Sequence, residues 1–513
     1  MNLFKGKSRL LSIALAMTLL TVLLSISVLV NATDEVTMIY GPEAISTGGD
    51  EETPQIALDS NGNVHIVWSS GETYLFYKML DSDGNVLIDE TNLNPCATPN
   101  SKHVRRPSIV IDSDDNIHVV FHGFSLYTQF GKTEYGGSIT LDASEVIYIK
   151  FNPYLDDRDG DAANFYDITV IPETIISTDD GVKSRAPNIA IDAWQRLHVV
   201  WFDGDIWECE GEIHYLVMDT NGNELVSESV LADGFYTDVD WSEPEIVVDS
   251  SGNAHIFFVT EGWTGDTYNW RDIWYVMADD SDGSILIAPT QLTDSGEQWK
   301  HSRPQVAIDS NDVIHVVYHD SRYQATGGQA ELFLFYVEPY LDDRDGDPAD
   351  PSIIVTLPPT QLTSNDGYRS YLKNIAIDPG DREHIVWIDQ RDFAPSPNWG
   401  IGEVYYMLRD VVSETRLTYF DGEVYPAYWW YSSGRNPDIA VTCSRLYITF
   451  NGYNITEDTS DIYLMIVNVP PCAITPVGGE VLAVNRLQLI TPYLLVLALA
   501  VAAIGVIFGK RFS

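Results

Sequence analysis

The chain repeats one pattern of apolar and polar positions seven times. Each copy starts with a short alternating segment, passes through a polar turn that carries an Asp, and continues into an apolar run that is typical of a buried strand. The first copy reads PQIALDSNGNVHIVW. The seven copies begin at Pro54, Pro107, Pro187, Pro244, Pro304, Lys373 and Pro437.

Each repeat unit contains four strand signals. In the third unit these are NIAID, LHVVW, EIHYLVM and ELVSESVL, which are rich in β-branched and aromatic residues. Turn-forming residues separate the third and fourth signals, as in DSDGN at 81–85 and DTNGN at 219–223. Because repeats of this length built from short strands are typical of propeller blades, the pattern predicts an all-β fold of four-stranded blades.

The two ends of the repeat array predict how the ring closes. The last unit stops after its third strand signal, DIYLMIV at 461–467, whereas an additional strand signal, VTMIYGPEAIST at 36–47, precedes the first unit. We expect this N-terminal strand to complete the last blade, because an unpaired sheet edge invites aggregation. The fold predicted is therefore a seven-bladed β-propeller closed by an N-terminal strand.

The repeat resembles those of seven-bladed propellers of the sialidase-like and NHL-like kinds, over roughly residues 34–470. In those repeats a turn similar to ALDSNGN is followed by a strand similar to HIVW. The Asp-box of sialidases is echoed by Ser82, Asp83 and Gly84, without its Trp. A likeness of this kind implies an architecture far better than an activity.

Both ends of the chain predict membrane targeting. Lys5, Lys7 and Arg9 precede an uncharged stretch, so residues 1–32 are expected to be a signal peptide or an uncleaved signal anchor. Residues 487–509 lack charge and are long enough to span a bilayer as a C-terminal transmembrane helix. The expected order is then an extracellular propeller at 33–470, a linker at 471–486, the helix, and a cytoplasmic tail at 510–513. The C-terminal segment resembles the anchors of archaeal cell-surface proteins.

Charge and cysteine content agree with an exterior domain. The formal net charge of −46 argues against nucleic acid as a partner and favours cations. None of the four cysteines has the spacing of a metal site, and an external compartment permits disulfides. Cys443 and Cys472 are the favoured pair. Asn454 begins an Asn-Ile-Thr pattern and is a candidate glycosylation site.

Residues that recur in nearly every unit are interpreted as structural, because a catalytic or metal site is needed once whereas each blade has the same folding problem. The Asp of the turn is expected to accept backbone hydrogen bonds and the His six residues later to bridge strands, as an Asp and a His do in WD-repeat blades. The aromatic residue three positions after the His is expected to wedge between blades. The Asp–His pairs are Asp59–His65, Asp112–His118, Asp192–His198, Asp249–His255, Asp309–His315 and Asp378–His384, and the aromatic residues are Trp68, Phe121, Trp201, Phe258, Tyr318, Trp387 and Phe450.

Two units carry an expanded acidic turn instead of a short hairpin. The turns read NPYLDDRDGDAAN at 152–164 and EPYLDDRDGDPAD at 338–350. Four carboxylates around a Gly suit the oxygen shell of a hard cation, and calcium is the candidate cofactor. The spacing differs from that of an EF-hand, so a solvated acidic turn is the alternative. The candidate ligands are Asp156, Asp157, Asp159 and Asp161 in the first turn, and Asp342, Asp343, Asp345 and Asp347 in the second.

Arginines gather in the loops before the first strands and after the second strands, which meet on one face of a propeller. Basic side chains there could hold a carboxylated or sulfated glycan, with Trp207, Trp263, Trp270 and Trp399 as stacking partners. The alternative is that the arginines form ion pairs that join neighbouring blades. The candidate ligand-binding residues are Arg106, Arg185, Arg303, Arg369, Arg435, Arg322 and Arg391.

Two functional classes follow from these observations. The first is a non-catalytic module for binding, adhesion or cell-envelope structure, tethered in the cell membrane, with glycans or envelope proteins as partners. The second is a sialidase-like enzyme that cleaves glycans. The sequence favours the first, because Val104-Arg105-Arg106-Pro107 and Ser302-Arg303-Pro304 only approximate the arginine motif of sialidases. No catalytic residue is assigned.

Overall fold

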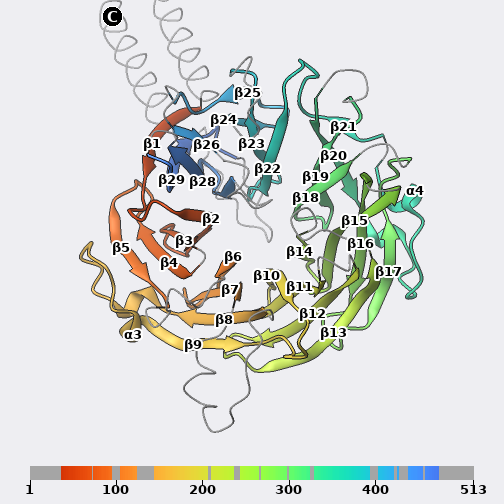
Figure 1. The fold of residues 1–513 in the computed structure, drawn as a ribbon, viewed down its shortest axis with the longest axis horizontal. Coiled ribbons are helices and arrows are strands. Elements are labelled where there is room, and N and C mark those ends of the chain that lie inside the picture. Colours follow the sequence, from red (N-terminus) through yellow and green to blue (C-terminus); the bar gives the residue numbers. More distant parts are fainter. Residues whose placement is uncertain are drawn as a thin grey trace, which may run out of the picture.

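The computed structural model describes residues 36–71, 73–94, 104–123, 144–205, 210–235, 243–264, 267–296, 300–323, 329–356, 358–392, 402–420, 424–426, 437–454 and 457–472. These residues form seven antiparallel sheets arranged around one axis, which is the predicted seven-bladed β-propeller (Figure 1). We number the blades in chain order from the first complete sheet.

In each blade the first strand lies nearest the axis and the fourth lies outermost (Figure 1). Blades one to three comprise β2 (Glu51–Leu58), β3 (Val64–Ser70), β4 (Tyr74–Leu80) and β5 (Val86–Asn92); β6 (Arg105–Ile111), β7 (Ile117–Gly123), β8 (Glu145–Phe151) and β9 (Thr169–Ile175); β10 (Ser184–Ile191), β11 (Arg196–Asp205), β12 (Glu210–Asp219) and β13 (Glu224–Phe235). Blades four to six comprise β14 (Glu245–Val248), β15 (Ala254–Thr264), β16 (Thr267–Ala278) and β17 (Ile285–Gln291); β18 (His301–Ile308), β19 (Ile314–Asp320), β20 (Glu331–Val337) and β21 (Thr360–Gln361); β22 (Ser370–Ile377), β23 (Glu383–Asp389), β24 (Glu403–Leu408) and β25 (Val412–Arg416).

Blade seven closes the ring with strands from both ends of the propeller. It contains β27 (Asp438–Val441), β28 (Arg445–Asn454) and β29 (Thr459–Asn468), and β26 (Val424–Pro426) also pairs with β28. The N-terminal strand β1 (Thr37–Ala44) pairs antiparallel with β29, from Thr37 opposite Asn468 to Ala44 opposite Tyr463. The predicted closure by the N-terminal strand is confirmed.

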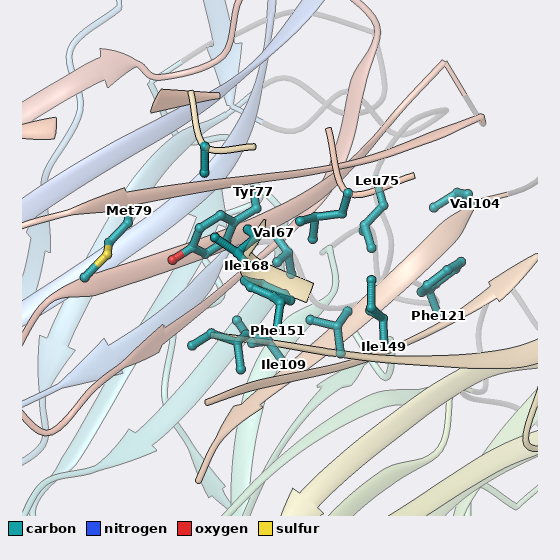
Figure 2. Close-up of a cluster of buried hydrophobic side chains, with 14 of the residues drawn as sticks. Val67, Leu75, Tyr77, Met79, Val104, Ile109, Phe121, Ile149, Phe151 and Ile168 are labelled. Carbon is teal, nitrogen blue, oxygen red and sulfur yellow. The ribbon is translucent and has the colours of Figure 1, made fainter. Parts of the chain in front are cut away.

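The hydrophobic core lies between neighbouring blades. Figure 2 shows one such layer, in which Val67 and Tyr77 of blade one pack against Ile109, Phe121 and Phe151 of blade two. The recurring aromatic residue is buried in all seven blades, with Trp68, Trp201 and Trp387 at 0% exposure. The predicted wedge packing is therefore confirmed, and each such burial contributes about 1.5–3 kcal/mol.

The recurring Asp and His contact each other in blades one to six. In blade one, Asp59 accepts the backbone N–H groups of Asn61 and Asn63 at 2.8 Å. His65 lies 3.1 Å from Asp59 through Nε2 and 2.8 Å from the hydroxyl of Tyr77 through Nδ1. Equivalent Asp–His–Tyr contacts join Asp112, His118 and Tyr148, and Asp192, His198 and Tyr215. This repetition confirms the structural interpretation.

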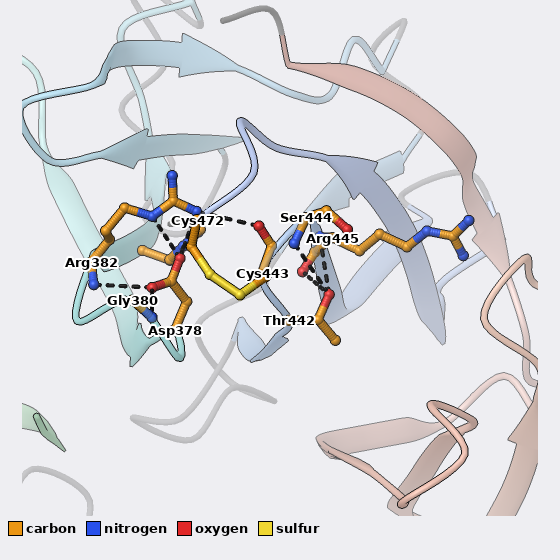
Figure 3. The surroundings of a disulfide bond; sticks show 9 residues. Asp378, Gly380, Arg382, Thr442, Cys443, Ser444, Arg445 and Cys472 are labelled. Carbon is orange, nitrogen blue, oxygen red and sulfur yellow. Dashed lines mark hydrogen bonds and ion pairs between the residues drawn. A yellow bond between two sulfur atoms is a disulfide. The ribbon is translucent and has the colours of Figure 1, made fainter. Parts of the chain in front are cut away.

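A disulfide links the turn between β27 and β28 of blade seven to the segment that follows β29. Cys443 and Cys472, whose pairing the sequence favoured, are joined with 4.8 Å between their Cα atoms (Figure 3). The N–H group of Cys472 donates to the carbonyl oxygen of Cys443 at 2.7 Å. Arg382 of blade six ion-pairs with Asp378 and also donates to that carbonyl, so the disulfide lies against the neighbouring blade.

The short helical elements belong to the two expanded turns. They are η1 (Pro153–Leu155) and α3 (Phe165–Ile168) in blade two, and η3 (Pro339–Leu341) and α4 (Pro351–Ile354) in blade five. Within the described residues no helix has the length and apolar character needed to cross a membrane. The predicted signal at 1–32 and the predicted transmembrane helix at 487–509 lie outside the described residues.

Candidate functional site

The candidate site lies where the first strands begin and the second strands end, at one end of the axis. We call this end the axial face. Five first strands contain a β-bulge there, and the bulged residue has a positive φ. These residues are Thr53, Arg106, Ala186, Arg303 and Leu372, with φ between 43° and 54°. The bulge thus belongs to the repeat, while the side chain that it carries differs from blade to blade.

A ring of polar side chains surrounds the axis at one position of the first strands, and hydrogen bonds join several of its members between blades. Glu245 of blade four accepts from Asn188 of blade three at 2.9 Å and from Gln305 of blade five at 2.8 Å. Asp438 of blade seven accepts from Asn374 of blade six at 2.7 Å. The ring comprises Gln55, Ser108, Asn188, Glu245, Gln305, Asn374 and Asp438. Such bonds between blades explain why polar residues occupy buried positions.

Blade six departs from the repeat at Lys373. The other six units have Pro at this position. The Lys373 side chain is fully buried and its Nζ donates to the carbonyl oxygen of Arg303 in blade five. Burial, and then the charge of Arg303, hold the pKa of Lys373 well below its ordinary value. A buried lysine beside an arginine is costly, so blade six departs from the repeat at the expense of stability.

Lys373 belongs to a group of basic side chains between blades five and six, which we call the cationic cluster. Its members are Arg303, His319, Arg369 and Lys373. Arg303, His319 and Arg369 are half-buried. Burial, followed by the charges of Arg369, Lys373 and Arg303, lowers the pKa of His319 well below its ordinary value, so this His is neutral near pH 7.

Acidic side chains from other blades approach the same face. The Arg106 Nε of blade two lies 3.2 Å from Glu243 Oε1 of blade four, and both side chains are largely buried. Burial raises the pKa of Glu52 in blade one to about 7, although the charges of Arg105 and Arg106 oppose this shift. Glu243 and Glu245 also act electrostatically on Lys373. The axial face therefore combines a cationic side with an acidic side.

Other polar contacts at the axial face recur and are structural by the same argument as the Asp–His pairs. Ser184 donates to Asp203 at 2.7 Å in blade three, and Ser370 donates to Asp389 at 2.9 Å in blade six. Blade five has His301 instead of Ser. Its ring nitrogens lie 3.1 Å from Asp272 of blade four and 3.2 Å from Asp320, which joins the two blades.

The predicted ligand-binding arginines separate into groups. Arg303 and Arg369 belong to the cationic cluster, Arg106 pairs with Glu243, and Arg185 lies on β10 at the same face. Arg322 and Arg391 instead pair with Asp320 and Asp389, two residues earlier in the chain, and stack on Phe333 and Tyr405. Arg435, Trp207 and Trp399 lie outside the described residues, whereas Trp263 and Trp270 lie on β15 and β16.

The two expanded acidic turns lie at the opposite end of the blades and reach back to the preceding blade. In the first, the hydroxyl of Tyr154 donates to Asp59 of blade one, and the N–H of Gly160 donates to the carbonyl of Leu87 at 3.1 Å. In the second, the Tyr340 hydroxyl donates to Asp249 of blade four at 2.7 Å. Each turn therefore joins its blade to the one before it, a role that the sequence analysis did not predict.

Calcium binding by these turns remains a prediction. A hydrogen bond that protonated Asp161 donates to Asp159, followed by the charge of Asp159, raises the pKa of Asp161, so the two carboxylates are adjacent. Among the described residues, however, no group of three or more His, Cys, Asp or Glu is arranged to hold a metal ion. Calcium would thus have to draw further carboxylates of the turn together.

If the turns bind calcium, millimolar calcium will raise the melting temperature by mass action. The double variant Asp159→Ala, Asp345→Ala will lose that rise. Differential scanning calorimetry with and without calcium checks this, with magnesium as the control ion. An unchanged melting temperature in calcium would leave the turns as contacts between blades.

The candidate glycosylation residue lies at the end of β28. The side-chain oxygen of Asn454 accepts the N–H group of Glu457 at 3.2 Å. The next two residues of the Asn-Ile-Thr pattern are outside the described residues. Modification at Asn454 therefore stays a prediction.

Comparison with known proteins finds similarity in structure and none in sequence. No family model and no curated protein matches the sequence. The polysaccharide lyase Uly1 is similar in structure at 12% identity, with a TM-score of 0.49, over 84% of this chain and 91% of the lyase. The Penicillium chrysogenum α-L-arabinanase is similar at 10% identity, with a TM-score of 0.41, over 85% and 99%. The GH93 α-L-arabinofuranosidase of Fusarium graminearum is similar at 12% identity, with a TM-score of 0.42, over 71% and 93%.

Proposed function

We propose that this propeller recognises an anionic glycan at the axial face, through the cationic cluster. The observation that carries the proposal is Lys373, which replaces the proline of the other six units and lies buried beside Arg303. Residues that solve a problem common to all blades recur in the repeat. Lys373 occurs in one blade, brings a buried amino group to the axis, and lies there with Arg303 and Arg369.

The charge distribution supports an anion as the ligand. The chain has 29 basic and 75 acidic residues, yet the cationic cluster gathers Arg303, Arg369 and Lys373 beside His319. Guanidinium groups bind carboxylate or sulfate through paired hydrogen bonds, and these bonds are strong where water is excluded. A polyanionic glycan would also avoid the strongly acidic remainder of the surface by binding at this one face.

The setting that we propose for this recognition is the outside of a cell. The expected signal at 1–32 and helix at 487–509 would hold the propeller outside a membrane, and the Cys443–Cys472 disulfide suits an oxidising compartment. In this setting the protein would act as a binding, adhesion or cell-envelope module.

Cleavage of the bound glycan is the second candidate function. One acidic group at the axial face favours it, because its pKa suits proton transfer at neutral pH. Burial raises the pKa of Glu52 to about 7. A general acid or base is efficient when its pKa lies near the working pH. The same assay that tests binding distinguishes the two functions.

Affinity electrophoresis of the purified full-length chain tests the proposal. We expect gels that contain dextran sulfate or polygalacturonate to retard the protein. Gels that contain neutral dextran should not retard it. Added salt should weaken the retardation. Arg303→Ala, Arg369→Ala and Lys373→Pro should each weaken binding about tenfold or more, since each removes a charged contact. Lys373→Pro restores the residue of the other units and should keep the fold.

Arg158→Ala is the matched control. Arg158 lies in the first expanded turn at the opposite end of the blades, where it stacks on Tyr154. Its loss should leave retention unchanged. Equal migration of the wild type in all gels would refute anionic glycan recognition, and release of sugar fragments by the wild type would assign cleavage.

A further inference from the structure

His319 is a titratable group within the cationic cluster that ligand binding would affect. It lies on β19 opposite Ser302 of β18 and Leu332 of β20. Its Nε2 atom is buried and has no hydrogen-bond partner among the described residues. A buried ring nitrogen without a partner is uncommon, and one that lies beside three cations is in a suitable place to meet an anion.

The groups around His319 come from every strand packed against it. Arg303 lies on β18, Asp320 is the next residue of β19, and Arg369, Tyr371 and Lys373 belong to blade six. On β20, Glu331 accepts hydrogen bonds from Thr363 at 2.7 Å and Ser370 at 3.4 Å, while His301 and Arg322 pair with Asp320. Asp320 and one oxygen of Glu331 thus have partners, and the charges of Arg369, Lys373 and Arg303 outweigh that of Asp320 at His319.

We infer that an anionic group of the ligand occupies the space between Arg303, Arg369 and Lys373 and that His319 takes up one proton from solvent when it does so. The inference rests on the proposed function and deepens it. The proton binds to the unprotonated ring nitrogen of His319, and the imidazolium then donates to an oxygen of the anion. An anion within about 4–6 Å favours the charged imidazole, just as the unliganded cations oppose it.

Linkage determines the sign of the pH dependence. Because the pKa of His319 is higher in the liganded state than in the free state, affinity for the anion increases as pH falls through the liganded pKa. An increase of one in the pKa corresponds to about tenfold in affinity. Glycans with sulfate and glycans with carboxylate share this chemistry, provided that the carboxylate stays ionised.

Nuclear magnetic resonance of the full-length chain with ¹⁵N-labelled histidine tests the inference, with inorganic sulfate as the probe. The His319 signals are assigned by their loss in His319→Asn, and His319→Gln is a second variant should the first fail to fold. We expect sulfate to raise the pKa of His319 by about 1 or more. Sodium chloride at equal ionic strength should have a smaller effect.

His122 is the internal control. It occupies the equivalent position in blade two, opposite Arg105, and its Nδ1 accepts the N–H group of Ala186 at 3.3 Å. Its pKa should not respond to sulfate. An unchanged His319 pKa at saturating sulfate, or an equal rise at His122, would overturn the inference.

Failure of the glycan proposal is distinguishable from failure of this inference. Retention on dextran sulfate with a His319 pKa that ignores sulfate would leave the proposed function standing and refute proton uptake. A sulfate-dependent His319 pKa in a protein that no polyanion retards would instead support the anion site and refute the glycan.

Discussion

A chain that begins at Glu51, without β1, is expected to aggregate. β1 supplies the outer strand of blade seven, and its removal exposes the edge of β29 along Thr459–Asn468. That edge is rich in apolar residues and would carry backbone groups without partners, so it can pair with the same edge of another molecule. Ile45 also leaves the core layer between blades seven and one. Size-exclusion chromatography and thermal unfolding check this outcome.

A point variant makes the same test at full length. At Gly41 in β1, which has a φ of +72°, an added Cβ would lie 2.1 Å from the carbonyl oxygen of Leu464. Gly41→Ala should therefore loosen β1 from β29. Gly62 has a similar φ of +79° and nothing within 4 Å, so Gly62→Ala is the matched control for backbone strain alone. A monomeric shortened chain with an unchanged melting temperature would show that closure by β1 is dispensable.

Arg106→Ala is expected to lower the free energy of unfolding by about 3–5 kcal/mol, because it leaves Glu243 as a buried charge without this partner. The two side chains are 13% and 6% exposed, so solvent screens the pair little. Chemical denaturation of the variant measures the loss. Exposed surface ion pairs contribute less than about 1 kcal/mol. A loss of that size would contradict the interpretation of Arg106 and Glu243 as a buried ion pair.

The double variant Arg106→Ala, Glu243→Gln separates the ion pair from other contacts of Arg106. Removing the carboxylate charge should recover most of the lost stability, since the buried charge causes the cost. If the double variant is as unstable as Arg106→Ala alone, packing of the arginine rather than its charge supports the ring. Retention on polyanions in these variants shows whether Arg106 also contributes to binding.

The architecture could be predicted from the sequence because it depends on repetition. The turn Asp, the His and the aromatic wedge occur in nearly every unit, so each position could be interpreted by comparison with its equivalents. Closure by β1 followed from the missing strand of the last unit. These features lie within one blade or between two neighbouring blades, so the repeated sequence pattern is enough to predict them.

The site could be predicted only in part. The loops that carry Arg303 and Arg369 were expected at one face, but which side chains meet there depends on the bulges of the first strands and on contacts across the axis. Arg322 and Arg391 lie close in sequence to Asp320 and Asp389, and these short-range pairs form. Lys373 had a signal in the sequence, the loss of a proline that six other units keep. His319 had none, because His122 occupies the same position in blade two.

The strands that close the ring also determine at which end of the propeller the two termini lie. Thr37 opposite Asn468 places the first and last strands side by side, and both leave the propeller at the end of the axis opposite to Arg303 and Lys373. The Cys443–Cys472 disulfide fixes the chain where it leaves the propeller after β29. A membrane tether at either terminus would therefore attach to the end of the propeller opposite the axial face. The cationic cluster would then face away from the membrane, where a large polymer can reach it.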